Sequence, residues 1–298
     1  MARVLVTGAT GFVGGRVARA LRARGDEVVA VVRTPSDDLA ALGVAQPVVA
    51  LTDTEALAAA MRGADAVVHA AAGVGPDLDT ARTVNTVGTR AVVDAALAAG
   101  VRRLVHVSTT SVYDLEAVGD AEVAEDAPLA RAGTKPPAAS SAGSSYAVTK
   151  AEAEAEVVRG GRQGLSVAIL RPPAVLGAGP TSTWGTRVPQ GFVAGALSPR
   201  PPETTFGWVH VDDLVDAALA AVDGDADATV NVVGGHTTFD AYLRALRTFL
   251  PDAPAEDAVT SDAPWRGTYA TDRLPALFGV RPTRDFETAM AEIRASWT

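Results

Sequence analysis

A tyrosine and a lysine lie four positions apart in the stretch "SSYAVTKAEAEAE", residues 144–156, of a chain that has only 4 tyrosines. On a helix this spacing puts Tyr146 and Lys150 on one face, one turn apart. The phenol of tyrosine has an ordinary pKa of about 10, and a neighbouring ammonium favours the phenolate and lowers that pKa. The pair could therefore exchange a proton with an alcohol or a carbonyl. Alternatively, both residues are exposed on a helix surface and take no part in chemistry.

A run of hydroxyl side chains ends an apolar stretch in "HVSTTSVYD", residues 106–114. If that stretch is a strand of an open α/β sheet, its carboxyl end lies at the edge where such sheets bind ligands. A hydroxyl at this edge could donate a hydrogen bond to a developing oxyanion. The alternative is an ordinary Ser/Thr-rich strand end.

The N-terminal stretch "VTGATGFVG" places glycines at 8, 11 and 14, directly after a strand pattern and at the start of a helix pattern. A side chain at Gly8 would obstruct a tight turn, one at Gly11 the pyrophosphate, and one at Gly14 the packing of helix on strand. The free amides and the helix dipole then favour a diphosphate, unless the turn binds nothing. The expected cofactor-binding residues here are Gly8, Thr10, Gly11, Phe12, Val13 and Gly14.

The second strand pattern ends in Arg33 rather than in an acidic residue. At this point an Asp or Glu would accept from a free ribose 2′-OH, whereas an Arg favours a 2′-phosphate. The sequence therefore predicts NADP, with NAD possible because Asp37 and Asp38 lie nearby, and a solvated Arg33 is the alternative. Asp53 either contacts the adenine amino group or caps the helix that follows it.

Short apolar runs alternate with helical patterns through the first half of the chain, which predicts an α/β fold with a doubly wound parallel (Rossmann) sheet. The expected strands are 3–7, 27–33, 47–51, 66–70, 103–108 and 165–172, with helices at 80–99 and from 144 onward. Residues 228–235 are expected to form a further strand that returns to this sheet. Residues 114–144 show little periodicity and are expected to form a surface excursion.

Proline, glycine and all 4 tryptophans occur after the sixth strand, which predicts a smaller C-terminal substrate lobe. We expect a dinucleotide-binding domain of residues 1–175 plus about 208–235. The substrate-binding lobe is expected at about 176–207 plus 236–298.

Composition excludes several classes of function. The net charge of −9 disfavours nucleic acid or an anionic membrane as a partner. The absence of cysteine excludes disulfides and thiolate chemistry, and the four histidines, which lack metal-ligand spacing, are expected to be structural, with no metal. Neither a signal peptide nor a membrane-spanning apolar run is apparent, so we expect a cytoplasmic protein that acts on a small molecule.

Taken in order, these motifs resemble those of the extended short-chain dehydrogenase/reductase family, the group of NAD(P)-dependent epimerases and dehydratases. The resemblance covers nearly the whole chain. The matching stretches are "TGATGFVG", "HAAAG" (residues 69–73), "VNTVGT" (84–89), "VSTTSVYD" (107–114), "YAVTK" (146–150), "LRPPAVLGAGP" (170–180) and "WVHVDDLVDA" (208–217).

The resemblance implies roles for several of these residues. Tyr146 would be the general acid/base, Lys150 would lower its pKa and bind the nicotinamide ribose, and Thr109 would orient the substrate oxygen. Asn85 would lie near that ribose, and further cofactor contacts would come from Ala70, Ala71, Ala72 and Pro173. Many family members are homodimers formed through two helices of each chain, which makes a homodimer possible here.

Departures from the family pattern bear on the substrate. Thr110 and Ser111 replace the Asp-Glu pair of sugar-nucleotide dehydratases, so dehydration by that route is not expected. Ala174 and Phe206 stand where nucleotide-sugar epimerases usually carry Asn and Arg, which favours a smaller or more apolar substrate. Arg187 in the expected lobe could bind an acidic group or face water. The apolar side chains offered for the substrate are Leu176, Trp184, Val188, Phe192 and Trp208.

Three functions remain open on these grounds. The favoured one is an NADP-dependent oxidoreductase that acts on a carbonyl or secondary alcohol of a small organic substrate. The second is an NAD(P)-dependent sugar epimerase that uses the same three side chains. The third is a dinucleotide-sensing module without catalysis, which retention of both Tyr146 and Lys150 disfavours.

Overall fold

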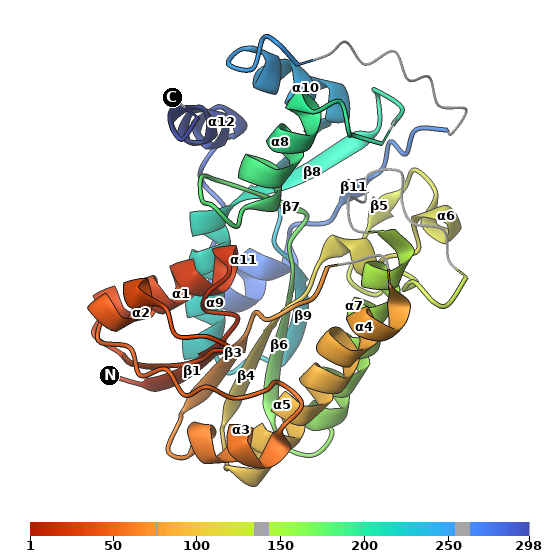
Figure 1. The fold of residues 1–298 in the computed structure, drawn as a ribbon. Helices are drawn as coiled ribbons and strands as arrows, with labels where there is room; N and C mark the ends of the chain where they lie inside the picture. Colours follow the sequence, from red (N-terminus) through yellow and green to blue (C-terminus); the bar gives the residue numbers. More distant parts are fainter. Residues whose placement is uncertain (75–76, 134–142, 199, 254–262, 298) are drawn as a thin grey trace.

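The computed structural model describes residues 1–74, 77–133, 143–198, 200–253 and 263–297, with the side chains of 143 and 144 excepted. Its centre is a six-stranded sheet in the order β2-β1-β3-β4-β6-β9 (Figure 1). All neighbouring strands of this sheet are parallel, as predicted. The strands are β1 (Arg3–Thr7), β2 (Glu27–Val31), β3 (Ala66–His69), β4 (Arg103–Val107), β6 (Ser166–Arg171) and β9 (Ala228–Asn231).

Helices cover both faces of this sheet, because successive apolar residues of a strand point to opposite sides. Val4 and Val6 of β1 belong to the apolar cluster that contains Leu21 of α1 and Leu214 of α9. Leu5, between them, belongs to the cluster that includes α3 and α5. One face carries α1 (Phe12–Ala23), α2 (Asp37–Ala41), α9 (Val211–Asp223) and α11 (Arg273–Phe278); the other carries α3 (Thr54–Met61), α5 (Gly88–Ala98) and α7 (Gly143–Gly161).

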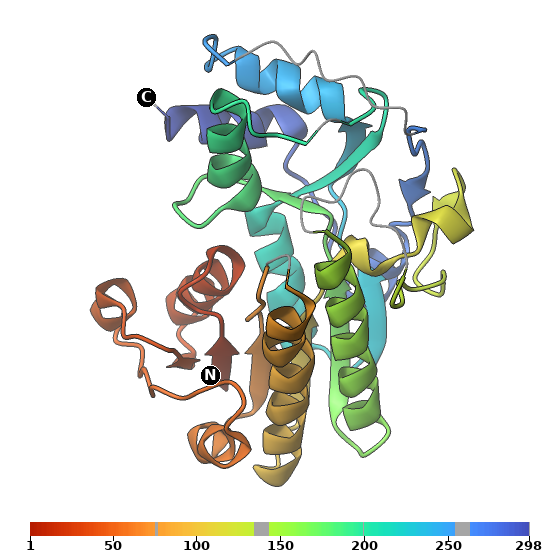
Figure 2. The same cartoon turned by 45° about the vertical axis from the view of Figure 1, so that its right-hand side comes forward.

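The helix expected at 80–99 is one helical run with a π-helical turn in it: α4 (Leu78–Arg82), η1 (Thr83–Val87) and α5. Figure 2 shows this run beside α7, the helix that carries Tyr146 and Lys150. None of the helices in the described ranges combines the length and the apolar character that a membrane crossing requires.

A second, smaller unit stands above the carboxyl ends of the parallel strands (Figure 1). Its three-stranded mixed sheet has the order β10-β8-β7. Its core is aromatic and contains Trp184, Phe206, Trp208, Phe239 and Tyr242. The elements are β7 (Ala174–Leu176), η3 (Thr183–Arg187), α8 (Val188–Val193), β8 (Thr205–His210), β10 (Gly235–Thr238), α10 (Phe239–Arg247) and α12 (Phe286–Ala295). The expected Rossmann sheet with a smaller C-terminal lobe is therefore confirmed.

The surface excursion contains short elements in its described part. These are the 3-10 turn η2 (Thr110–Val112), α6 (Leu115–Val118) and β5 (Glu122–Val123). β5 pairs in parallel with β11 (Thr268–Tyr269), which brings residues near the C-terminus to the excursion. Residues 134–142 of the expected excursion lie outside the described residues.

The strand expected at 47–51 is not a regular strand. Pro47 has no backbone N–H, so it cannot donate to a ladder. The segment instead follows the edge of β2 through an isolated bridge between Val32 and Val48. Its bonds there include Val32 N–H to Pro47 O at 3.1 Å and Val49 N–H to Val32 O at 3.1 Å.

Candidate active site

The carboxyl ends of the parallel strands and the segment η3 border a cavity of about 850 Å³. Most of the site residues expected from the sequence line it, from separate elements of the fold. They are Gly8, Thr10, Gly11, Phe12, Val13, Gly14, Arg33, Ala70, Ala71, Ala72, Thr109, Tyr146 and Pro173. Asp53, Asn85 and Lys150 do not line the cavity.

The turn after β1 is built so that only glycine fits two of its positions. Gly8 has φ +72°, and a Cβ there would lie 2.6 Å from Ala71 N. A Cβ at Gly14 would lie 2.3 Å from Gly8 O, so the helix can approach the turn only without one. Gly11 is the N-cap of α1 and supplies no side-chain cap, which leaves amides of the first turn for a ligand. This cradle fits the diphosphate of a dinucleotide.

Arg33 is exposed just after β2 and lines the cavity. The acidic residues that follow it do not line the cavity. Asp38 forms an ion pair with Arg19, with Oδ2 2.9 Å from Nη2. Asp53 caps α3 by accepting from Ala56 N at 3.0 Å, which is the alternative that its sequence context offered.

Tyr146 and Thr109 line the cavity together, from α7 and from the end of β4. Thr109 is the N-cap of η2, and its Oγ1 accepts from Ser111 N at 3.1 Å. Its hydroxyl proton therefore remains available to a substrate oxygen. Burial raises the pKa of Tyr146 to about 12, so the phenol is protonated at neutral pH.

Lys150 lies behind the cavity wall and is 1% exposed. Its Nζ donates to Val107 O at 2.9 Å and lies 3.0 Å from His106 Nε2. Burial lowers the pKa of Lys150 to about 8. The Tyr–Lys spacing predicts a lowered phenol pKa, and the structure shows the opposite direction, because burial dominates at Tyr146 and Lys150 contacts β4.

A buried ion pair that sequence reasoning missed lies one turn beyond Lys150. Glu154, only 3% exposed, binds Arg171 through Oε2–Nη2 at 2.6 Å and Oε1–Nε at 2.9 Å. Ser108 Oγ donates to Glu154 Oε1 at 2.5 Å. The carboxylate thus ties β4, α7 and β6 together behind the cavity. The sequence signal was the spacing of four from Lys150, hidden within "AEAEAE".

Asn85 also lies behind the wall, in the π-helical turn η1. Its side chain accepts from Gly73 N at 2.7 Å and donates to Gly73 O at 3.0 Å and to Thr149 Oγ1 at 2.9 Å. In this arrangement Asn85 fixes the segment after β3 against α7.

Two histidines are packed in the sheet next to Lys150. His69 Nδ1 lies 2.6 Å from Thr7 Oγ1 and its Nε2 lies 2.9 Å from Thr89 Oγ1. Burial, and then the charge of Lys150, lower the pKa of His69 to about 3 and that of His106 well below its ordinary value. Both imidazoles are neutral over the physiological range.

The end of the cavity beneath the second unit is apolar and aromatic. Trp184, Phe206 and Tyr269 line it, and the Trp184 and Phe206 rings meet edge to face with centroids 4.9 Å apart. Of the apolar side chains that the sequence offered here, only Trp184 lines the cavity; Leu176, Val188, Phe192 and Trp208 lie in the adjoining core. Tyr269 of β11 was not foreseen, since no local pattern places this residue beside β5 and at the cavity.

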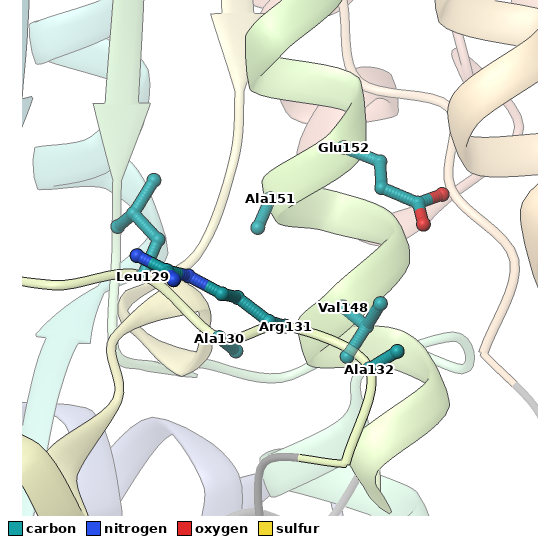
Figure 3. A pocket seen from close by; sticks show the side chains of 7 residues that line it. All are labelled: Leu129, Ala130, Arg131, Ala132, Val148, Ala151 and Glu152. Carbon is teal, nitrogen blue, oxygen red and sulfur yellow. The ribbon is translucent and has the colours of Figure 1, made fainter.

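A smaller hollow of about 490 Å³ lies on the opposite side of α7. Figure 3 shows Val148 and Ala151 facing the segment 129–132, with Glu152 directed to the other side of the helix. Glu152 forms an ion pair with Arg82: Arg82 Nε donates to Oε2 at 2.9 Å and Arg82 Nη2 donates to Oε1 at 2.8 Å. None of the expected site residues lines this hollow.

Several known proteins are similar to this chain. Sterol demethylase protein B of Methylococcus capsulatus is 33% identical over 81% of this chain and 73% of its own length. A 2-alkyl-3-oxoalkanoate reductase of Stenotrophomonas maltophilia is 35% identical over 59% and 52%. A 4-hydroxy-2-methyl-3-oxo-4-farnesyl-3,4-dihydroquinoline-1-oxide ketoreductase of Stigmatella aurantiaca is 34% identical over 91% and 79%.

The fold and the family are both established by such comparisons. The solved structure of MoeE5 in complex with UDP-glucose and NAD superimposes with a TM-score of 0.81 at 23% identity, over 99% of this chain and 98% of that one. The family model of the NAD dependent epimerase/dehydratase family matches residues 4–234. The chain thus belongs to the NAD dependent epimerase/dehydratase family and is an NAD(P)-dependent enzyme with a Rossmann fold.

Proposed function

We propose that the protein is an NADP-dependent reductase of a carbonyl group in a small organic substrate, with Tyr146, Lys150 and Thr109 as its site. The observation that carries this proposal is that Tyr146 and Thr109 line the same cavity as the glycine turn. Reduction requires a proton donor for the developing alkoxide, and a phenol with a pKa of about 12 is in the donating form at neutral pH.

Each side chain has a defined task. Thr109 Oγ and the Tyr146 phenol donate hydrogen bonds to the substrate oxygen, and Tyr146 gives up its proton to that oxygen. The Lys150 ammonium has three donors, of which Val107 O and His106 take two, so one remains for the cofactor ribose. NADPH, when bound, supplies the hydride. The amides at the start of α1 hold its diphosphate and Arg33 its 2′-phosphate.

Two of the relatives support a carbonyl substrate. The proteins from Stenotrophomonas and Stigmatella are an oxoalkanoate reductase and a ketoreductase. Phe206 supports it as well: this position, where nucleotide-sugar epimerases usually have an arginine, is buried in an aromatic cluster. A sugar diphosphate would lack that cation here.

The experiment is NADPH oxidation with a panel of ketones and aldehydes, using wild type and Tyr146→Phe. We expect turnover in wild type and a loss of about 10²- to 10⁴-fold in kcat for Tyr146→Phe, since the proton donor is gone. NADPH binding, followed by its fluorescence, should be retained. The proposal fails if no carbonyl in a broad panel consumes NADPH, or if the phenylalanine variant turns over like wild type.

The second candidate is an epimerase that oxidises and re-reduces its substrate, favoured by the likeness of the fold to MoeE5, solved with UDP-glucose and NAD. It predicts cofactor retained through purification and turnover of a nucleotide sugar without net change in NAD(P)H. Dinucleotide binding with an inert Tyr146 would instead indicate a sensing module.

A further inference from the structure

The charges around the cavity are unusual for an acidic protein. The chain has a net charge of −9, yet among the described residues no Asp or Glu lines the cavity. Within the described ranges, Arg33 and Arg187 are the only charged side chains that line it. Arg33 belongs to the adenosine end, and Arg187 to the end under the second unit. Each arginine therefore gives its own end of the cavity a local positive potential.

Arg187 has no carboxylate partner in the described part of the chain. It forms no ion pair there, whereas Arg16, whose side chain reaches the same segment at Ala178 O, binds both Asp212 at 3.0 Å and Glu292 at 2.9 Å. The exposed guanidinium of Arg187 keeps its donors for a ligand.

The backbone that carries Arg187 is held firmly. The π-helical turn η3 is capped by Ser182, whose Oγ accepts from Gly185 N at 2.9 Å and whose carbonyl accepts from Arg187 N at 3.1 Å. The Tyr242 hydroxyl donates to Trp184 O at 2.5 Å, which ties the turn to α10. π-Helical turns are rare in proteins, and a large share of those that occur lie at functional sites. The other such turn, η1, also borders this cavity, through Thr83 and Val84.

The surroundings of Arg187 define the rest of the ligand. Trp184 and Phe206 form an apolar wall, and the hydroxyls of Thr181 and Thr183 are the polar groups nearest in sequence that also line the cavity. A single guanidinium matches one carboxylate, which it can bind through two parallel hydrogen bonds.

We propose that Arg187 makes the enzyme select carbonyl substrates that carry a carboxylate at the end remote from the reacting carbonyl, joined to it by an apolar or aromatic body. This inference rests on the proposed function, because it places the reacting carbonyl at Tyr146. Arg187 is the specificity-determining residue and takes no part in the proton transfer.

The test compares ω-aroyl carboxylates, with one to four methylene groups between carbonyl and carboxylate, with their methyl esters, for the NADPH-loaded enzyme. We expect Arg187→Gln to raise KM for the best acid about tenfold to a hundredfold, since hydrogen bonds to a charged group are lost. The ester should change by about twofold or less, and Arg187→Lys should recover part of the loss. The matched control is Arg62→Gln, which removes the same charge from an exposed site outside the cavity.

A binding measurement separates this inference from the proposed function. Titration of NADP-loaded enzyme with 4-phenylbutanoate and with 4-phenylbutanamide, followed by calorimetry, requires no turnover. Tighter binding of the acid, lost in Arg187→Gln and kept in Arg62→Gln, supports the anion site even if no ketone is reduced. Equal binding of acid and amide, or equal effects of the two variants, overturns it.

Discussion

Tyr146 and Lys150 lie on one helix, but their polar ends face different surroundings. Burial raises the pKa of Tyr146 to about 12 and lowers that of Lys150 to about 8. At neutral pH the phenol is therefore protonated, and the ammonium stays charged with Val107 O and His106 as its hydrogen-bond partners. For oxidation the phenol would first have to lose its proton, which the apolar surroundings oppose.

The proposed contact of Arg33 with the 2′-phosphate can be tested by comparing how strongly a variant binds NADPH and NADH. We expect Arg33→Ala to raise KM for NADPH about tenfold or more and to leave KM for NADH nearly unchanged, because only NADPH carries the phosphate that the guanidinium would bind. The readout is coenzyme-dependent thermal stabilisation, which follows affinity, together with KM.

Arg102→Ala, on an exposed residue outside the cavity, is the control for the loss of charge. Equal weakening of NADH and NADPH in Arg33→Ala would show that Arg33 contacts some other part of the dinucleotide. Preference of wild type for NADH would contradict the NADP assignment itself.

At the scale of an element, α7 separates two environments. Tyr146, Lys150 and Glu154, at successive spacings of four, lie on the side toward β4 and the cavity. Val148 and Ala151 face the segment 129–132 (Figure 3). The Glu154–Arg171 pair fixes this orientation, because it joins the helix to β6 while Ser108 joins it to β4.

Glu154→Gln should be strongly destabilising. Arg171 would stay buried without its carboxylate, and removing one partner of a buried pair typically costs about 3 to 5 kcal/mol of unfolding free energy. Urea unfolding measures this loss. Glu152→Gln, which breaks the partly exposed pair with Arg82, is the matched control on the same helix and should lose clearly less.

A double substitution, Glu154→Leu with Arg171→Met, keeps the volume and removes both charges. It should recover most of the lost stability, because no unpaired charge remains in the core. If Glu154→Gln and Glu152→Gln destabilise equally, the pair does not have the role assigned to it.

The same elements show how far the sequence alone could lead. Periodicity and the glycine turn predicted the strands of the main sheet, with the exception of 47–51, where Pro47 prevents a regular ladder. Local spacing also predicted that Tyr146 and the glycine turn belong to a site. It could not predict that Glu154 is buried while Glu152 and Glu156 stay partly exposed, nor that Tyr269 of β11 lines the cavity, because both depend on contacts between segments far apart in the chain.

At the scale of the whole molecule, the chain passes repeatedly between the two units. It leaves the main sheet after β6, builds β7, η3, α8 and β8, returns for α9 and β9, and leaves again for β10 (Figure 1). The cavity lies where these crossings occur, with the dinucleotide turn on one unit and Trp184 and Arg187 on the other. Stability of the main sheet and integrity of the site are therefore linked.

Acid should weaken the whole fold through two histidines in the main sheet. The pKa of His69 is lowered to about 3, and that of His106 lies well below its ordinary value. Below pH 6.5 the unfolded chain binds protons that these two native imidazoles do not, so stability falls as the pH falls. Between pH 7 and pH 5 this amounts to about 2 kcal/mol of unfolding free energy for each histidine.

Urea unfolding near pH 7 and near pH 5 measures this loss, and His106→Gln isolates one contribution. Glutamine retains an acceptor for Lys150 but takes up no proton in the unfolded chain, so about half of the acid-induced loss should disappear in the variant, whatever its stability at pH 7. The slope of the unfolding free energy against urea concentration should be the same in both proteins, because the surface exposed on unfolding is unchanged. If wild type and variant lost equal free energy on acidification, His106 would have to bind its proton in the folded state, and the neutral imidazole that accepts from Lys150 would be contradicted.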